Sequence, residues 1–185
     1  MSGRGSAPRR VLIVDGYNVI NARREDGGFT AATLADARER LAEALMEYAG
    51  WSGQQVILVF DAWQSDRPTR TEEARGPLTV VYTRRGEIAD RYIERLCDGL
   101  ARDIENHRVE VRVASSDALE QTIVLGRGAA RMSARELIAE MRQLRSDGIR
   151  RAAPVQPARA RSAIGERLPE DVRRKLNALR GDGGR

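Results

Sequence analysis

Aspartates follow three short apolar segments of this chain, at positions where a buried strand would end. Asp15 comes directly after VLIV, Asp61 directly after VILVF, and Asp117 after RVEVRVA with two serines between. A carboxylate directly after a buried strand indicates that its charge serves a function at the edge of the sheet, outside the core. If the three strands lie parallel in one sheet, their carboxyl ends meet at one edge, where ligands bind in sheets of this kind.

Two further acidic pairs have helical spacing. Glu87 and Asp90 are three residues apart in TRRGEIAD, and Asp117 and Glu120 repeat this spacing in SSDALE. At the start of a helix such a pair shares one face of the first turn, where the helix dipole favours negative charge. Ordinary helix caps and first-turn acids have the same pattern, and that alternative stays open for every acid here, with the least weight at Asp15 and Asp90.

The charge density of these acids indicates a metal ion. Two carboxylates about 5 Å apart repel by roughly 3 kcal/mol at an effective dielectric of ~20, and a divalent cation removes that penalty. An all-oxygen ligand set without histidine or cysteine favours Mg²⁺ or Mn²⁺ over zinc. Asn18, shortly after Asp15, can add an amide contact to the metal or the substrate.

The elements that must position these residues alternate between strands and helices. The sequence predicts strands over 10–14, in QQVILVFDAW, over 78–83 and over 108–114, the last near a sheet edge because its valines alternate. Helices are expected over 33–50 with Gly50 as the stop, over 87–104, from Ser115 onward, and over 133–148, where Ser133 and Glu136 have capping-box spacing. Residues 21–30 and 64–77 are expected to be loops.

This order predicts an α/β sandwich with a mostly parallel central sheet, built from residues 10–148. Residues 1–9 are expected to be a disordered leader, and residues 149–185 a basic linker followed by a short helix. No apolar run approaches the ~20 residues that a membrane-spanning helix needs, and no signal peptide is evident, so the expected location is cytoplasmic, without a membrane partner.

Composition excludes several kinds of chemistry. The chain has one cysteine, one histidine and one lysine, Cys97, His107 and Lys175. Internal disulfides, zinc clusters, Ser-His-Asp triads and Walker-type lysine chemistry therefore do not fit. The net charge of +5 comes almost wholly from arginine and suits an anionic partner, although coding bias explains it equally well.

Five segments together resemble the YacP-like branch of the NYN domain family, which is similar to PIN and FLAP-type nucleases. They are VDGYNVI, VILVFDAW, EIADRYIERL, VASSDALEQ and GRGAARMSARELI, in family order over about residues 10–148. The resemblance implies a PIN-like three-layer α/β/α fold. It also implies a metal-dependent endoribonuclease, and in this branch a characterised type associates with the ribosome and cuts mRNA in the decoding site.

The resemblance assigns residues motif by motif. Asp15, Asp90 and Asp117 match the catalytic, metal-holding positions, and Asn18, Asp61 and Glu87 match supporting ones. Ile88 departs from the pattern, since threonine is frequent there. In the mechanism expected for such a site, divalent ions activate water for in-line attack on a phosphodiester. RNA, and not DNA, is the expected substrate, and the candidate phosphate contacts are four arginines, Arg84, Arg85, Arg91 and Arg131.

Competing functions fit the sequence less well. A haloacid-dehalogenase-type phosphatase needs an acid two residues after Asp15, where Tyr17 stands, and a phosphorelay receiver needs a late lysine that the domain lacks. GRGAARMS lacks the spacing and the preceding strand of a dinucleotide fingerprint. The remaining alternative is a catalytically inactive RNA- or ribosome-binding module of the same fold.

Overall fold

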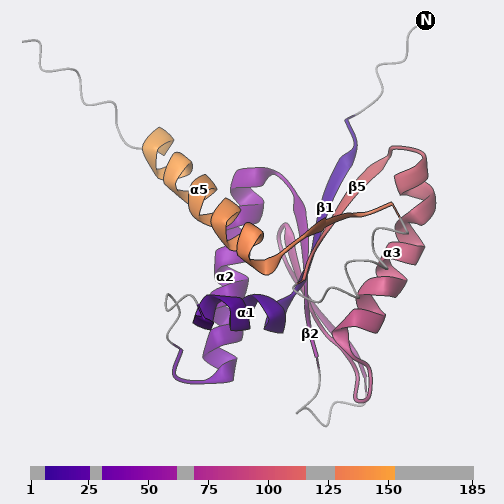
Figure 1. The fold of residues 1–185 in the computed structure, drawn as a ribbon, viewed down its shortest axis with the longest axis horizontal. Helices are drawn as coiled ribbons and strands as arrows, with labels where there is room; N and C mark the ends of the chain where they lie inside the picture. The colour runs from indigo at the N-terminus through magenta and orange to yellow at the C-terminus, as the bar shows by residue number, and fades with distance from the viewer. Residues whose placement is uncertain (1–6, 26–30, 62–68, 116–127, 153–185) are drawn as a thin grey trace, which may run out of the picture. The chain divides into compact units, whose positions relative to one another are not determined.

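A computed structural model describes residues 7–25, 31–61, 69–115 and 128–152 of the chain (Figure 1). Within these residues six strands form one sheet in the order β3-β4-β2-β1-β5-β6. The strands are β1 (Arg9–Asp15), β2 (Gln55–Phe60), β3 (Thr71–Arg75), β4 (Leu78–Tyr82), β5 (Val109–Ala114) and β6 (Ala130–Met132). All neighbouring pairs are parallel except β3 with β4, which confirms the predicted mostly parallel α/β sheet.

Helices cover both faces of the sheet and make the three layers (Figure 1). α1 (Gly16–Glu25), α2 (Leu34–Ser52) and α5 (Ala134–Ala152) pack on one face, and α3 (Ala89–Glu105) packs on the other. None of these helices, in the part of the chain that the structure describes, is long and apolar enough to cross a membrane.

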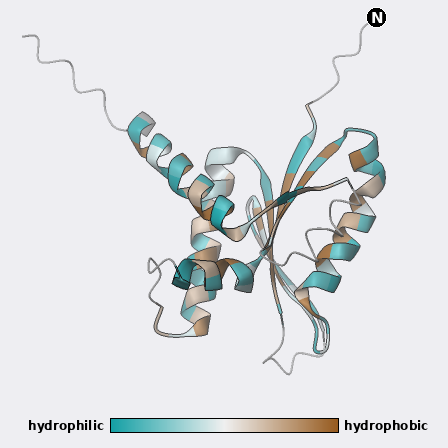
Figure 2. Ribbon diagram, viewed as in Figure 1, coloured by the Kyte–Doolittle hydropathy of each residue, from teal (hydrophilic) through white to brown (hydrophobic). Residues whose placement is uncertain are grey.

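Strand β1 shows why its apolar run is unbroken. Leu12 and Val14 belong to the core under α1 and α2, whereas Val11 and Ile13 belong to the core under α3. A central parallel strand is buried on both faces, so both sets of alternating side chains must be apolar. Figure 2 shows the same distribution, with hydrophobic residues concentrated in the strands and on the helix sides that face them.

The prediction of a loop over 21–30 is wrong for its described part, because α1 begins at Gly16 and continues to Glu25. The Asp15 carboxylate accepts a hydrogen bond from the Asn18 backbone N–H, the bond of a helix N-cap. Gly16 is required by packing, since a Cβ there would lie 2.2 Å from the Phe60 ring. What reads as a turn in DGYN is therefore a helix start pressed against the end of β2. Residues 26–30 lie outside the described chain.

The prediction of a loop over 64–77 is also wrong for part of its length. Residues 71–75 form β3, which pairs antiparallel with β4 across a turn at Gly76. β3 lies at the sheet edge, and its polar sequence TEEAR follows from that exposure. A polar edge strand lacks the alternating apolar pattern by which strands are found in a sequence.

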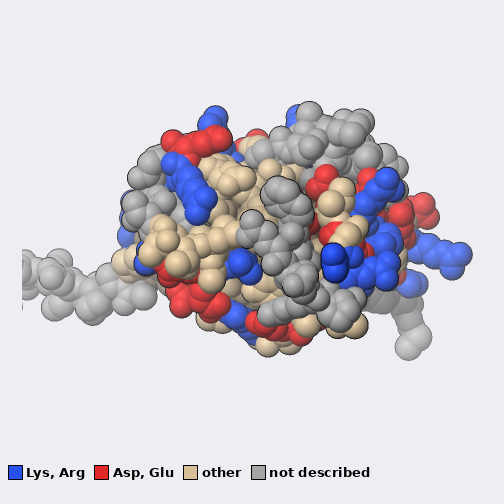
Figure 3. Space-filling view, turned by 90° about the horizontal axis from the view of Figure 1, so that it is seen from below, with Lys and Arg blue, Asp and Glu red and all other residues tan. Residues whose placement is uncertain are grey.

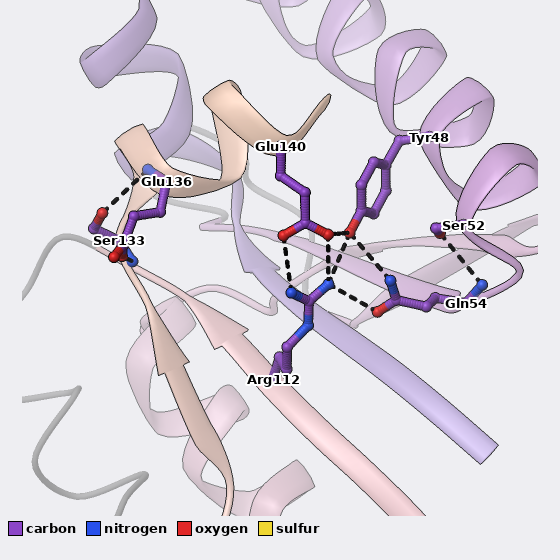
Figure 4. A network of polar contacts seen from close by, with 7 residues as sticks. All are labelled: Tyr48, Ser52, Gln54, Arg112, Ser133, Glu136 and Glu140. Atoms are coloured by element: carbon purple, nitrogen blue, oxygen red, sulfur yellow. Dashed lines mark hydrogen bonds and ion pairs between the residues drawn. The ribbon is translucent and has the colours of Figure 1, made fainter. Parts of the chain in front are cut away.

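Helix ends differ from the sequence at the end of α2, at the start of α3 and at the end of α5, which continues to Ala152 past the expected end at residue 148. The start of α5 agrees. α2 passes through Gly50 and ends at Gly53, whose φ of 66° gives the left-handed cap that a glycine adopts easily. α3 begins at Ala89, so Glu87 precedes the helix and does not share its first turn with Asp90. The capping box before α5 is confirmed, because Ser133 and Glu136 each accept a hydrogen bond from the backbone N–H of the other (Figure 4).

A polar network ties β5 to the helices that cover it (Figure 4). The Arg112 guanidinium donates to both Glu140 carboxylate oxygens, at 2.9 and 3.0 Å, and to the Tyr48 hydroxyl at 2.8 Å. Gln54 accepts a further bond from Arg112 and donates one to Tyr48. The predicted alternation of β5 holds, since its valines face the core under α3 and Arg112 faces α2 and α5.

Candidate functional site

Asp15 is the last residue of β1 and lies at the carboxyl edge of the sheet, 7% exposed. Besides its bond to the Asn18 N–H, its second carboxylate oxygen accepts from Asn18 Nδ2 at 2.8 Å. Asn18 Nδ2 also donates to Ser115 Oγ at 3.1 Å. Ser115 follows β5, whose Ala114 pairs with Val14, so three segments fix the Asp15 carboxylate in place.

The charge of Asp15 is poorly compensated. The pKa of the Asp15 carboxyl is raised to about 6, chiefly by burial; the hydrogen bonds from Asn18 act to lower it, and the charges of Asp90 and Asp61 act to raise it. No arginine of the described residues forms an ion pair with Asp15. A buried carboxylate with two acidic neighbours and no cation is costly for a fold to keep without a use.

Asp61 and Asp90 complete the described part of this acidic corner. Asp61 follows β2 and accepts a hydrogen bond from the Ala89 backbone N–H, which caps α3 where Ile88 offers no side-chain oxygen. Burial raises the pKa of the Asp61 carboxyl, and the charge of Asp90 raises it as well. Asp90 lies in the first turn of α3 and acts electrostatically on both other aspartates. The structure therefore brings Asp15, Asp61 and Asp90 within electrostatic reach of one another.

Glu87 lies in a different environment from the three aspartates. Its side chain is 4% exposed and forms ion pairs with Arg70, at 2.9 Å, and with Arg95. The Arg84 backbone N–H donates to the same carboxylate at 3.3 Å. The predicted metal ligand Glu87 is thus already bound to two guanidinium groups.

Three of the four predicted phosphate-binding arginines lie together. Arg84, Arg85 and Arg91 line a pocket of about 410 Å³, which Arg95, Gly86 and Glu87 complete. All three are exposed, and neither Arg84 nor Arg91 forms an ion pair with a carboxylate of the described residues. Seen from below, arginines gather beside acidic residues on the side of the molecule that carries α3 (Figure 3).

Of the remaining predicted residues, one lies within the described part of the chain and two lie outside it. Arg131 lies on β6, exposed, and its charge lowers the pKa of Glu136, so it belongs to the start of α5 and not to the pocket. Asp117 and Glu120 lie outside the described residues, as does the helix expected after Ser115.

A divalent cation fits the acidic corner in charge and in donor type. Asp15, Asp61 and Asp90 offer only oxygen, which hard cations prefer, and their mutual repulsion is the penalty that a cation removes. Among the residues that the structure describes, no three acidic, histidine or cysteine side chains are grouped closely enough to hold a metal by themselves.

Sequence reasoning missed three polar residues around the site. Ser115 could have been found, because it directly follows a strand at the same edge as Asp15. Arg95 is four residues after Arg91 on α3, a spacing that places both on one helix face. Arg70 carries no such signal, since it precedes the polar strand β3.

The chain resembles known proteins over most of its length. Residues 12–181 match the YacP-like NYN domain family, a match that continues beyond residue 148, where the domain was expected to end. The protein named "Uncharacterized protein YacP" from Bacillus subtilis (strain 168) is 36% identical over 131 residues, which are 71% of this chain and 74% of that protein.

Two crystal structures of Rae1 (YacP) from Bacillus subtilis resemble the fold. A single-substitution variant is 32% identical with a TM-score of 0.62, and the match covers 92% of this chain and 99% of that one. The other structure is 30% identical with a TM-score of 0.62, over 93% and 95% of the two chains. The chain therefore belongs to the YacP-like NYN domain family, whose PIN-like domains are generally of the nuclease type.

Proposed function

We propose that this protein is a metal-dependent endoribonuclease whose active site is the acidic corner around Asp15. The observation that carries the proposal is the burial of Asp15 beside Asp61 and Asp90, at the carboxyl edge of the sheet, without a cationic partner in the described chain. A site that needs positive charge and offers only oxygen ligands suits Mg²⁺ or Mn²⁺. The family supports nuclease chemistry for that site.

In this proposal the ligands are Asp15, Asp90 and Asp117, with Asp61 beside them. A bound divalent ion supplies a nucleophile at neutral pH and stabilises charge on the phosphate. Asn18 orients Asp15 through two hydrogen bonds and is itself held by Ser115. Asp61 fixes the start of α3, and with it the position of Asp90. The site thus needs no histidine base.

The basic pocket supports RNA as the substrate. Arg84, Arg85 and Arg91 line a hollow that ends at Gly86 and Glu87, and these two residues also line a second pocket with Asp61. An RNA strand whose phosphate backbone lies against these arginines therefore passes close to the acidic corner. Arginines bind successive phosphates without reading sequence, so these contacts position the chain and do not select it.

The ribosome is the proposed site of action. This part of the proposal comes from the resemblance to the YacP-like branch, which implies cutting of mRNA during translation, and we propose a cytoplasmic location with it. We propose Arg131 as a further RNA contact, apart from the pocket. It is exposed on β6, near the carboxyl end of the sheet where Asp15 also lies.

The test is cleavage of a purified single-stranded RNA with Mg²⁺ or Mn²⁺, and with EDTA. We expect internal cuts by the wild type that EDTA and Asp90→Asn abolish. Asp103→Asn is the matched control, because Asp103 is a partly exposed acid on the same helix, paired with Arg108 at 3.7 Å. Cuts that survive in EDTA or in Asp90→Asn would overturn the site assignment. RNA binding without any cuts would favour the inactive binding module instead.

A further inference from the structure

Glu87 stands between the acidic corner and the basic pocket. It lines the pocket of Arg84, Arg85, Arg91 and Arg95, and it also lines a pocket of about 220 Å³ with Asp61, Gly86 and Ile88. Its backbone is fixed as well, since the Thr83 hydroxyl donates to the Glu87 carbonyl oxygen at 2.6 Å. A charged side chain in this position could serve either the metal or the arginines.

The contacts of the Glu87 carboxylate favour the arginines. Oε1 accepts from Arg70 and pairs with Arg95, and Oε2 accepts from Arg70 at 3.3 Å and from the Arg84 N–H. A carboxylate has about four acceptor positions, so these contacts leave none for a metal. Two guanidinium charges on the same carboxylate would also repel a divalent cation brought to it.

The two arginines that Glu87 holds are placed to contact RNA. Arg70 lies over the Tyr92 ring, with its guanidinium carbon 4.3 Å from the ring centroid, and its side chain is 34% exposed. The Arg95 side chain is 53% exposed and lines the basic pocket. Each guanidinium has five donors, so pairing with Glu87 leaves donors free for phosphate oxygens. A side chain fixed in advance also loses less rotational entropy when it binds.

We propose that Glu87 is a positioning residue for the substrate and not a metal ligand: it holds Arg95, which lines the basic pocket, and Arg70, which shares the same carboxylate, so that both present ordered donors to RNA phosphates. This inference rests on the proposed function, because it assumes that RNA is the ligand of the pocket. It assigns Arg70 and Arg95 to RNA binding beside Arg84, Arg85 and Arg91.

The sign of the Glu87→Gln effect separates positioning from simple charge. Removing a negative charge next to five arginines strengthens RNA binding if only net charge matters. If Glu87 orders Arg70 and Arg95, the same substitution weakens RNA binding despite the gain in positive charge. We expect the dissociation constant for a short single-stranded RNA to rise about tenfold, equivalent to one lost charge-assisted contact.

RNA binding is best measured in the Asp90→Asn background, where the RNA stays intact. Arg95→Gln should weaken binding about as much as Glu87→Gln, and the double variant by less than the two effects combined, since both substitutions remove the same Glu87–Arg95 arrangement while the ordering of Arg70 is lost only with Glu87. Arg40→Gln is the matched control: the Arg40 side chain is also 53% exposed and also paired with an acid, Asp36, but it lies on α2. Glu43→Gln, also on α2, controls for the charge removed at Glu87.

Metal binding supplies an independent readout. Calorimetric titration of Mn²⁺ into Glu87→Gln should give the wild-type affinity within about twofold, whereas Asp90→Asn loses the binding. In the cleaving enzyme, Glu87→Gln should raise KM about tenfold and lower kcat less than threefold, because the contacts it orders hold substrate.

Three results would overturn the inference. They are loss of Mn²⁺ binding in Glu87→Gln, tighter RNA binding by Glu87→Gln, and additive effects of Glu87→Gln and Arg95→Gln. If Glu87→Gln does not fold, wild-type RNA affinity in Arg95→Gln overturns the inference by itself. All of these outcomes leave wild-type cleavage intact. A wild type that neither binds nor cuts RNA contradicts the proposed function, and this inference with it.

Discussion

The acidic corner and the Arg112 network are both clusters of polar groups beside core strands, and they compensate charge in opposite ways. Around Arg112, one guanidinium, one carboxylate, one hydroxyl and one amide satisfy each other across β5, α2 and α5. Around Asp15, three aspartates of the same sign meet, and the hydrogen bonds of Asn18 are the main compensation that the described chain offers.

The pKa shifts record this difference. The bond from Arg112 lowers the pKa of Glu140, and the bond to Glu140 raises the pKa of Arg112, so both charged forms are stabilised. Burial raises the pKa of Asp15 to about 6, so its charged form is destabilised. The Arg112 network compensates the charge of Glu140 with its own guanidinium. The negative charge of the acidic corner is instead left for a bound cation to compensate.

The largest expected effect is on cleavage. Asp15→Asn should lower the rate of RNA cleavage about a thousandfold or more, since loss of the metal removes several kcal/mol of transition-state stabilisation. Glu140→Gln should leave the rate within about twofold, because the Arg112 network touches none of the site residues that the structure describes. Initial rates of cleavage of purified RNA test both predictions. If Glu140→Gln lowers the rate as much as Asp15→Asn does, the proposed difference in function between the two regions is wrong.

The free energy of unfolding should increase in the same Asp15→Asn variant that loses activity. Without metal, Asp15→Asn should stabilise the fold by roughly 3 kcal/mol at pH 7.5, as expected for a pKa raised by about two units. The folded pKa lies above the unfolded one, so the ionised carboxylate costs stability above pH 6. That cost fades as the pH falls from 6 toward 4. Urea unfolding of both proteins across this range gives the difference, and a gain that does not shrink at low pH would contradict the assigned pKa.

The Arg112 network should show the opposite pH dependence. Glu140→Gln should destabilise the fold by about 1–2 kcal/mol at pH 7.5, a value reduced because both side chains are about one-third exposed. The pKa of Glu140 is lowered in the folded state, so its contribution is present above the unfolded pKa and is lost in acid. The same urea series should therefore show the Glu140→Gln deficit closing as the pH falls below about 4.5.

The smallest effect concerns the orientation of Asp15. Asn18→Ala removes the side-chain bonds to Asp15 and Ser115 and should lower the cleavage rate about tenfold, the lower end for a residue that orients a metal ligand. The Asn18 side chain lowers the pKa of Asp15, so its loss should move the acid limb of the pH–rate profile to higher pH. A rate change without that movement would mean that Asn18 acts on something other than Asp15.

The sequence predicts the strands and their acids well because both follow from burial. VLIV and VILVF are apolar at every position since they are covered on both faces, and the first polar residue after each marks the sheet edge. Asp15 and Asp61 come together because their strands are parallel neighbours, whereas Asp90 joins them because Asp61 caps the helix that carries it.

The misplaced features depend on contacts between distant residues. The start of α1 cannot be recognised in DGYN, because it depends on Asp15 as the N-cap and on the Phe60 ring, which leaves room only for a glycine at position 16. Glu87 has helical spacing to Asp90 yet precedes α3, which Asp61 caps from another strand. The pairing of Glu87 with Arg70 joins the residues before α3 to the residues before β3, and no local pattern encodes it.

RNA-end mapping in a translating cell extract tests the central claim most directly, with wild type and Asp90→Asn compared at equal concentration with Mg²⁺ and Mn²⁺ present. A parallel reaction blocks translation initiation. We predict new internal RNA ends with the wild type alone, and only while translation proceeds. Ends that persist without translation would contradict the ribosomal part of the account. Identical ends from wild type and Asp90→Asn would contradict an active site at the acidic corner.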